Sequence, residues 1–484
     1  MQKPKYSIVI PTCERATLLE YTIKGCLLQN HGDYEILISN NCSRDNTNII
    51  LEKFKSVPQI RVVESKTRLA MPMHWEFAMS HALGEYIIIL GDDDGISPDL
   101  LNILDNIIDQ SDANIIKWKS YCYHHPDWPG PEANNLRVDK KYSSKVHNML
   151  PEKIIKDYAK VKYQYFPNLL QTCFSKDLFK RAKAKTNKVF VGAPDYSCPA
   201  LLLMDPKAKY VHIDAVLGFG GRSKYSNAAY ISSTEETRDK RIKEFLKEFN
   251  NEDPFPHHQP KIWAFSNLLM ASLSYAQYYY PNIISDDSIN LTGLCKRIQN
   301  EIRSFKGTGE IRIINKNQLD SFYQFVESLS AQQKQIIKSM PGYPSFNGKY
   351  NLIVERIKNK GNNILYRFFQ ILPDFIRSLI KKLFKNSRRN FTGEQPKSQT
   401  KSQDPTVWLD VTKYGCFNGE DVMSKLVELV EIGERECFAH SNSIINEVEG
   451  VKKIGEINNI SNKNEVSEQK QVKLIFKESY SNYE

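Results

Sequence analysis

The sequence predicts an α/β protein built on a mostly parallel sheet. Over the first hundred residues, short apolar runs of strand type alternate with segments whose apolar residues recur at helical spacing. Polar or acidic residues come directly after several of these runs, where each strand should end. Alternating strands and helices are typical of a buried, Rossmann-like sheet of parallel strands joined by right-handed crossovers and flanked by helices.

The predicted elements succeed one another closely up to residue 118. Pro11 ends the first apolar run, and Ser43 or Asp45 can cap the second helix. Gly84 closes the helix before the fourth strand. Strands are expected at 6–10, 34–38, 60–63, 86–90 and 114–118, and helices at 18–28, from 47, at 72–82 and at 99–108.

Beyond residue 120 the composition shifts several times. A polar, Pro-rich loop is expected at 121–146, and strands and helices mix again up to residue 219. A short amphipathic helix is expected at 420–432. We predict an α/β domain at 1–230, a helical region at 231–350, a basic amphipathic helical segment at 351–390, and a polar linker with a partly disordered tail at 391–484.

The composition is that of a globular chain, with 484 residues of which 41% are hydrophobic and 25% charged. The net charge of +10 favours anionic partners, but no zinc finger, RNA-binding signature or recognition helix points to nucleic acid. Nine cysteines without a CxxC pair indicate free thiols in a reducing compartment. The N-terminus has no secretory signal, and residues 262–280 are too polar for a membrane span and predict a buried helix. A cytoplasmic location is expected, either free or peripheral on the inner face of a membrane.

Three adjacent aspartates, Asp92, Asp93 and Asp94, come after the apolar run at 86–90. Ligands of parallel sheets bind outside the carboxyl ends of the strands, where the loops after the first two strands should also lie. Adjacent carboxylates repel one another, so they must stay solvated or bind a cation. Oxygen ligands select Mg²⁺ or Mn²⁺, which also take substrate phosphates. The alternative is a solvated acidic turn before a capped helix.

The first hundred residues resemble the family 2 glycosyltransferases, which have the GT-A fold. The resemblance lies in SIVIPTCERATLLEYTIKGCLLQ, YEILISNNCSRDNT and RLAMPMHWEFAMSHALGEYIIILGDDDGISPDLL. It extends over residues 5–105, is fainter over 106–225 and is absent beyond. It implies a nucleotide-sugar donor, most commonly a UDP-sugar, bound with Mn²⁺ or Mg²⁺, and makes residues 1–230 the GT-A catalytic domain.

The resemblance also implies which residues bind the donor. Relatives often carry an aromatic residue where Cys13 stands, and at least one Asp where Asn40 and Asn41 stand, so the base preference can differ here. A surface arginine is the alternative for Arg68. The division of roles among the three aspartates stays open. The expected donor-binding residues are Pro11, Thr12, Cys13, Glu14, Asn40, Asn41, Arg68 and Asp92, and the expected metal ligands are Asp93 and Asp94.

Inverting transfer needs a general base on the acceptor side. The resemblance implies that Asp195, in VFVGAPDYSCPALLL, is this base, and the alternative is that it caps the next helix. Asp205 and Asp214 are rival candidates. A basic loop after the strand-like run at 210–219 could neutralise the leaving diphosphate through Arg222, Ser223 and Lys224, or could be an ordinary surface loop.

The stretch PDFIRSLIKKLFKNSRRN, residues 373–390, has an apolar face and a face rich in Lys and Arg, and with the apolar residues before it forms a basic amphipathic segment at 365–389. This pattern is typical of a helix that lies on an anionic membrane surface, and packing against the catalytic domain or a second subunit is the alternative. A membrane position would suit a lipid-linked or glycan acceptor.

The sequence therefore predicts an inverting, metal-dependent glycosyltransferase that acts in cell-surface polysaccharide synthesis. One rival is a degenerate relative that binds nucleotide or glycan as a membrane-surface scaffold, suggested by Cys13, Asn40 and Asn41. Another is a nucleotidyltransferase, but PTCERA lacks the glycine-rich phosphate loop which that chemistry usually needs.

Overall fold

The computed structural model describes residues 3–128, 132–139, 145–191, 194–226, 255, 259–262, 264–307, 316–339, 406–414, 416, 418–426 and 428–429. The chain divides into two compact units, one made of residues 1–337 and 405–484 and the other of residues 338–404. The sheet and the candidate site belong to the first unit. The basic segment predicted at 365–389 lies outside the described residues.

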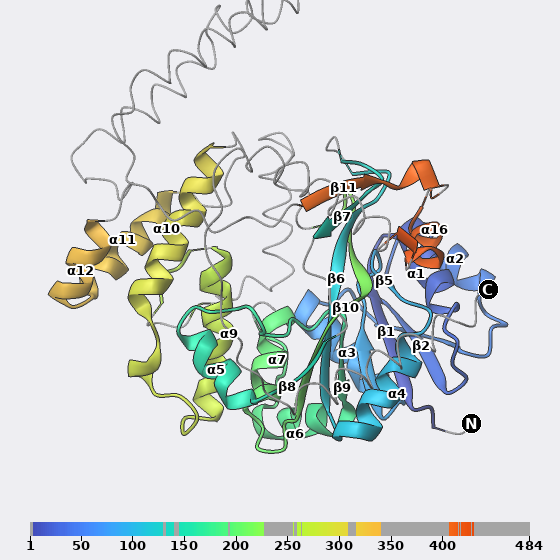
Figure 1. Ribbon diagram of the computed structural model, residues 1–484, viewed down its shortest axis with the longest axis horizontal. Coiled ribbons are helices and arrows are strands. Elements are labelled where there is room, and N and C mark those ends of the chain that lie inside the picture. The colour runs from blue at the N-terminus through green and yellow to red at the C-terminus, as the bar shows by residue number, and fades with distance from the viewer. Residues whose placement is uncertain are drawn as a thin grey trace, which may run out of the picture. The chain divides into compact units, whose positions relative to one another are not determined.

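The first unit is built on one mixed sheet whose first four long strands are parallel (Figure 1). These strands lie in the order β3 (Ile60–Glu64), β2 (Tyr34–Asn40), β1 (Tyr6–Thr12) and β4 (Tyr86–Ile89). Next come β9 (Thr172–Ser175), β6 (Ile115–His124), β7 (Asn135–Asp139) and β11 (Thr406–Asp410), each antiparallel to the strand before it. β10 (Tyr210–Arg222) pairs in parallel with β6 and antiparallel with β5 (Gly95–Ile96) and β8 (Val146–Met149).

Helices cover the sheet and connect its strands. The helices of the parallel half are α1 (Ala16–Cys26), α2 (Thr47–Lys53), α3 (Met71–His81) and α4 (Leu100–Ser111). The later ones are α5 (Pro151–Ala159), α6 (Lys176–Thr186), α7 (Pro194–Met204), α9 (Phe265–Tyr279), α10 (Leu291–Gly307), α11 (Lys316–Ser328), α12 (Ala331–Lys338) and α16 (Gly419–Ser424). Short 3₁₀ turns lie at Asp286–Ser288 and Val411–Tyr414.

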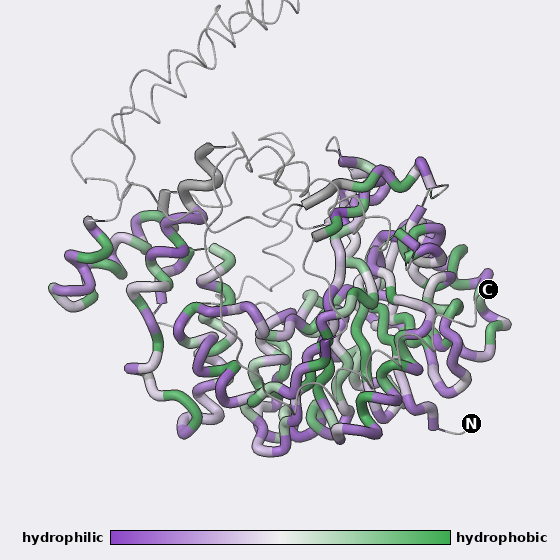
Figure 2. The backbone as a smooth tube through the Cα atoms, in the orientation of Figure 1, coloured by the Kyte–Doolittle hydropathy of each residue, from purple (hydrophilic) through white to green (hydrophobic). Residues whose placement is uncertain are grey.

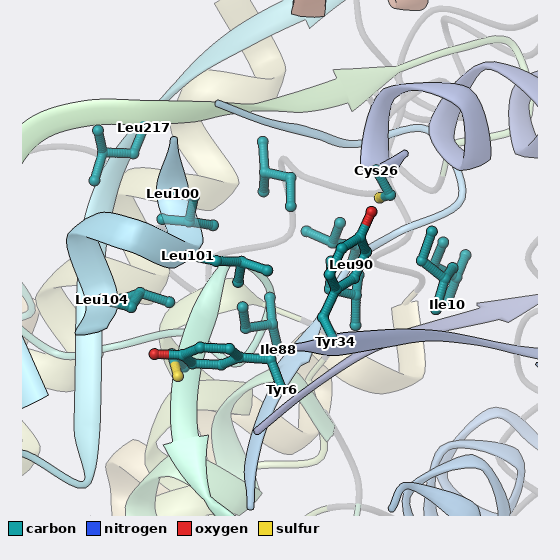
Figure 3. Close-up of a cluster of buried hydrophobic side chains, with 14 of the residues drawn as sticks. Tyr6, Ile10, Cys26, Tyr34, Ile88, Leu90, Leu100, Leu101, Leu104 and Leu217 are labelled. Atoms are coloured by element: carbon teal, nitrogen blue, oxygen red, sulfur yellow. The ribbon is translucent and has the colours of Figure 1, made fainter. Parts of the chain in front are cut away.

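The main core lies between the sheet and the helices α1, α2 and α4 (Figure 3). Tyr6, Ile88 and Leu90 from the central strands meet Leu101 and Leu104 from α4, and all five are buried. All residues of β2 are buried, because helices such as α3 cover the other face as well. Figure 2 accordingly shows the hydrophobic stretches gathered in the strands. This double burial is what the apolar runs of the sequence predict.

Several predicted boundaries differ from the structure. The first strand continues through Pro11 to Thr12. The strand predicted at 114–118 extends to His124, and the loop predicted at 121–146 contains that extension, β7 and the start of β8. Residues 406–429 fall in the predicted linker and tail, where only a short helix at 420–432 was expected. α16 lies at the start of that range, and β11, which was not expected, pairs with β7. Sequence periodicity misses this pairing because the two strands are far apart along the chain.

The predicted buried helix at 262–280 is confirmed as α9, most of whose residues are buried. Within the part of the chain that the structure describes, no helix is both long and apolar enough to cross a membrane.

Removing part of a fully buried side chain should destabilise the first unit. We expect Leu104→Ala to lower the free energy of unfolding by about 2–5 kcal/mol, because Leu104 is 0% exposed and its loss leaves a cavity. Urea unfolding measures the change. Ile49→Ala is the control, since Ile49 is 63% exposed and should change stability by less than about 0.5 kcal/mol. Equal effects of the two substitutions would contradict this core.

Candidate active site

The loops after β1, β2 and β4 meet at the carboxyl edge of the parallel strands, as the sequence predicts. Thr12 Oγ1 donates to Asp92 Oδ2 at 2.8 Å, which joins the end of β1 to the loop after β4. The Asn41 N–H donates to the Thr12 carbonyl oxygen at 3.0 Å. The Glu14 N–H donates to Ser43 Oγ at 3.0 Å, which joins the loops after β1 and β2.

Asp92 and Asp93 are buried, and the guanidinium group of Arg15 lies near both of them. They are 4% and 7% exposed. Arg15 Nη1 lies 2.9 Å from Asp92 Oδ1 and 3.7 Å from Asp93 Oδ2. Asp93 Oδ2 also accepts a hydrogen bond from Ser226 Oγ at 2.8 Å. Burial raises the pKa of Asp92, and the charge of the Arg15 guanidinium opposes that rise.

Asp94 is turned toward backbone amides. Its Oδ2 accepts from the Gly91 N–H at 3.0 Å, and its Oδ1 accepts from the Gly221 N–H at 2.9 Å. Burial and then the neighbouring Asp93 raise the pKa of Asp94 to about 7. The hydrogen bond to Gly221 fastens residues 91–94, called the aspartate loop, to β10. Asp94 thus has a structural role, and it also remains a candidate metal ligand.

Arg15 is a residue of the candidate site that the sequence pattern did not reveal. Besides Asp92 and Asp93, it reaches the Tyr225 carbonyl oxygen through Nη2 at 2.8 Å. It thus joins the first loop, the aspartates and the turn after β10. A signal was present, because a basic residue stands directly after a predicted donor loop and three buried carboxylates need a counter-ion.

The oxygen donors fit a hard divalent cation held through Asp93. Asp92 and Asp94 use both carboxylate oxygens in the contacts above, whereas Asp93 uses only Oδ2 in hydrogen bonds with described residues. Mg²⁺ is commonly held by one or two carboxylates together with water and substrate phosphates. Within the described ranges, no group of three or more His, Cys, Asp or Glu is arranged to hold a metal.

The two asparagines of the second loop bond to neighbouring residues of the protein and stabilise the shape of the loop. Asn40 Nδ2 donates to Glu64 at 3.2 Å, and Asn40 Oδ1 accepts the Ser43 N–H at 3.1 Å. Asn41 holds the backbone of Leu69 twice, accepting its N–H at 2.8 Å and donating to its carbonyl oxygen at 2.9 Å. A carbonyl oxygen has two lone pairs, so Asn40 Oδ1 can still accept from a base.

The remaining predicted donor residues lie at the same edge of the sheet. Pro11 is within β1, opposite Ser39 of β2. The Cys13 thiol contacts the Asn41 carbonyl oxygen at 3.7 Å. Arg68 Nη1 lies 2.6 Å from Glu14 Oε1. This ion pair joins Arg68 to the first loop.

Asp195 is the best placed of the three candidate bases. Asp205 is held by Arg181, with Nη2 3.0 Å from Oδ1. Asp214 lies 2.9 Å from Lys119 Nζ. By contrast, Asp195 Oδ1 is buried and has no hydrogen-bond partner among the described residues.

Asp195 does not cap its helix. α7 begins at Pro194, so Asp195 lies in the first turn of the helix. An acidic residue at that position is favoured by the helix dipole. Burial raises the pKa of Asp195 to about 6, and the charge of Lys117 opposes the rise.

Lys117 of β6 interacts electrostatically with both Asp94 and Asp195. Its Nζ donates to the carbonyl oxygens of Leu170 at 2.9 Å and Gln171 at 3.2 Å. Burial lowers its pKa to about 7, while the charges of Asp94 and Asp195 oppose the decrease. The Leu169 N–H donates to the Asp195 carbonyl oxygen at 2.8 Å, so one short segment contacts both the lysine and the candidate base.

The turn after β10 contacts the aspartates and Arg15. The sequence left open whether Arg222, Ser223 and Lys224 neutralise the leaving diphosphate or form an ordinary surface loop, and that role stays a prediction. The hydrogen bonds to Asp93 and Arg15 come from the Ser226 side chain and the Tyr225 backbone.

Part of the chain matches known glycosyltransferases. Residues 7–167 match the family model described as glycosyl transferase family 2. TuaG, a teichuronic acid biosynthesis glycosyltransferase of Bacillus subtilis, is 29% identical over 100 residues, which are 20% of this chain and 40% of TuaG. The GalNAc(5)-diNAcBac-PP-undecaprenol beta-1,3-glucosyltransferase of Campylobacter jejuni is 30% identical over 103 residues, which are 21% of this chain and 33% of that protein.

The chain thus spans at most 40% of the length of these two relatives. Among solved structures, residues 1–349 of S. aureus TarS in complex with UDP-GlcNAc align with a TM-score of 0.40 at 12% identity, over 67% of this chain and 91% of that one. Residues 7–167, a third of the chain, are thus similar to the glycosyltransferases of family 2, and the mixed sheet flanked by helices is the α/β architecture predicted from the sequence.

Proposed function

We propose that this chain is an inverting, metal-dependent glycosyltransferase. It would move a sugar from a nucleoside diphosphate, with UDP the first choice, to a glycan or lipid-linked acceptor of a cell-surface polysaccharide. The observation that carries the proposal concerns the carboxylate oxygens of Asp93 and Asp195. Asp93 keeps one oxygen out of its hydrogen bonds, and the Asp195 Oδ1 has no hydrogen-bond partner among the described residues. The names of the curated relatives support the acceptor class.

The proposed roles rest on the contacts of each residue. The first two loops, with Asn40, hold the nucleoside. Asp93 would hold a Mn²⁺ or Mg²⁺ ion, and the bound ion would neutralise the charge that develops on the leaving diphosphate. Asp195 takes the proton from the acceptor hydroxyl as the acceptor oxygen bonds to the anomeric carbon and the bond to the diphosphate breaks. Lys117 balances the negative charge of Asp195 and Asp94.

Nucleotide binding tests the donor site directly. We expect one of UDP, GDP, CDP and dTDP to raise the thermal unfolding midpoint of the full chain in the presence of Mn²⁺, because a ligand of the native state stabilises it by linkage. Asp93→Asn should remove the Mn²⁺-dependent part of the shift. Asp112→Asn is the matched control, since its side chain is 83% exposed and lies outside the site.

Two outcomes would redirect the proposal. If no nucleotide shifts the midpoint with Mn²⁺ present, the chain is better described as a degenerate, non-catalytic relative. Release of pyrophosphate instead of a nucleoside diphosphate from an active preparation would indicate nucleotidyl transfer.

Two adjacent glycines provide a sharper test of the aspartate loop. A Cβ on Gly221 would lie 1.7 Å from the Asp93 carbonyl oxygen, whereas a Cβ on Gly220 would meet nothing closer than 3.9 Å. Gly221→Ala must therefore displace Asp93, and a shift of about 1 Å can cost about a hundredfold in activity. We expect Gly221→Ala to lose Mn²⁺-dependent nucleotide binding and Gly220→Ala to keep it, both measured by thermal shift. Equal binding by both variants would argue against the loop geometry.

The pH profile tests the base. Asp195 acts only when ionised, and its pKa is raised to about 6. We expect kcat/KM to fall as the pH decreases through about 6 and to level off above it, measured as nucleoside diphosphate release from a cognate donor. Asp195→Asn should lose activity while keeping the nucleotide-induced thermal shift. A profile that falls only near the ordinary Asp pKa of about 3.9 would contradict the assignment.

A further inference from the structure

Residues 406–429, called here the returning segment, bring the far end of the chain back to the first unit. β11 pairs with β7 from Thr406 opposite Asp139 to Asp410 opposite Asn135. α16 contacts α1 and β5, and Lys24 Nζ lies 3.3 Å from Glu420 Oε2. Figure 1 shows β11 beside β7 and α16 beside α1. The returning segment therefore extends the sheet and covers the helix that comes after the first donor loop.

The returning segment also completes a second hydrophobic core. This core is separate from the one between the parallel strands and α4. Its members come from β6, β7, β10 and the returning segment, and each is less than a tenth exposed. They are Tyr121, Tyr123, Leu136, Val138, Val216, Phe219, Leu409, Val411, Cys416, Val422, Leu426 and Leu429. Half of this core is contributed by residues beyond 405, so the β6–β7 edge depends on them.

A chain of hydrogen bonds leads from this core to the aspartates. Asn134 Nδ2 donates to the Cys416 carbonyl oxygen at 2.9 Å, and the Asn134 carbonyl oxygen accepts the Val411 N–H at 3.4 Å. The Asn134 N–H donates to the His125 carbonyl oxygen at 3.5 Å. His125 Nε2 then lies 2.9 Å from the Asp93 carbonyl oxygen. Since a carbonyl oxygen only accepts, Nε2 carries the hydrogen.

The imidazole of His125 is confined on both sides. It is 2% exposed. A Cβ on Gly419, the first residue of α16, would lie 3.0 Å from His125 Cε1, and a Cβ on Gly221 would lie 2.9 Å from His125 Nε2. The next carbonyl oxygen of the loop, that of Asp94, accepts from Thr22 Oγ1 of α1 at 3.1 Å. The aspartate backbone is thus held by His125, which lies against α16, and by Thr22 of α1, the helix that α16 contacts.

We propose that the returning segment is a working part of the donor site: it holds His125 against the backbone of Asp93, and His125 is a positioning residue for that aspartate. The positioning of the loop is independent of the proposed function. Its consequence for metal binding rests on that function, and the two are tested separately.

Hydrogen exchange on the unliganded full chain tests the positioning. His125→Leu removes the hydrogen bond to Asp93, whereas His125→Gln keeps a donor at a similar reach. We expect the amides of Gly91 and Asp94 to exchange about tenfold faster in His125→Leu, as the loss of one hydrogen bond predicts, and to be restored in His125→Gln. The Ile36 amide, bonded to the Gln59 carbonyl oxygen, is the internal control and should not change. Unchanged exchange at Gly91 and Asp94 would overturn the proposal.

Releasing the returning segment should have the same effect on the loop. Val422 is 0% exposed in the second core, so Val422→Asp should expose the Cys416 amide, which bonds to the Val411 carbonyl oxygen, and raise exchange at Gly91 and Asp94. Protection kept at Gly91 and Asp94 while Cys416 loses it would refute the link. If Ile36 also loses protection, Val422→Ala replaces the harsher variant.

The metal readout separates positioning from simple stability. With UDP as probe, His125→Leu should need about tenfold more Mn²⁺ to reach half of the thermal shift, since groups that orient a metal ligand typically contribute that much to affinity. Tyr158→Phe is the matched control. It removes a buried hydroxyl that donates to the Leu269 carbonyl oxygen and lies outside the chain of hydrogen bonds that leads to Asp93. An equal Mn²⁺ requirement in both variants would reduce His125 to a structural role. A wild type that binds no UDP would count against the proposed donor and leave the exchange result standing.

Discussion

Three consecutive carboxylates removed from water at the end of a buried strand are the constraint on which this structure depends. A buried charge is costly unless hydrogen bonds or an opposite charge compensate it. Here the charge of each aspartate is compensated by a different set of partners. Asp92 takes a hydroxyl and a guanidinium, Asp93 takes the Ser226 hydroxyl, and Asp94 takes two backbone amides. These partners come from β1, the loop before α1, the start of the aspartate loop, β10 and the turn after it, so the strands and turns around the site are tied together by the needs of three side chains.

The same compensation is incomplete in a way that suits a transferase. Arg15 supplies a single positive charge to Asp92 and Asp93. Lys117 interacts electrostatically with both Asp94 and Asp195. Fully ionised, the aspartates exceed this local positive charge. Burial, and then the charge of Asp93, raise the pKa of Asp94 to about 7. A divalent cation arriving with a diphosphate would relieve that excess of negative charge. Cation and nucleotide should therefore bind together more readily than either alone.

Local pattern in the sequence predicted the parallel half of the sheet well, because apolar runs and helical spacing are properties of neighbouring residues. It also placed Thr12, Asn41 and Asp92 at one edge, as the structure confirms. It did not reveal Arg15, whose role depends on carboxylates distant in the chain. Nor could it show that Asn41 holds Leu69, since that contact is set by the path of a loop. The strands of 121–149 were missed because histidines and prolines there suggest a loop.

The returning segment exposes the limit of domain boundaries drawn from composition. Residues 391–404 look like a linker, and a linker suggests that the residues beyond it form an appendage. Yet β11 pairs with β7, and Leu409 and Val422 are buried in a core shared with β6. The first unit thus contains residues from both sides of 338–404 in the sequence, and the basic stretch at 365–389 falls within that interval. A chain shortened at residue 390 would lose part of the second core along with the tail. An internal deletion is therefore the change that isolates the contribution of the basic stretch.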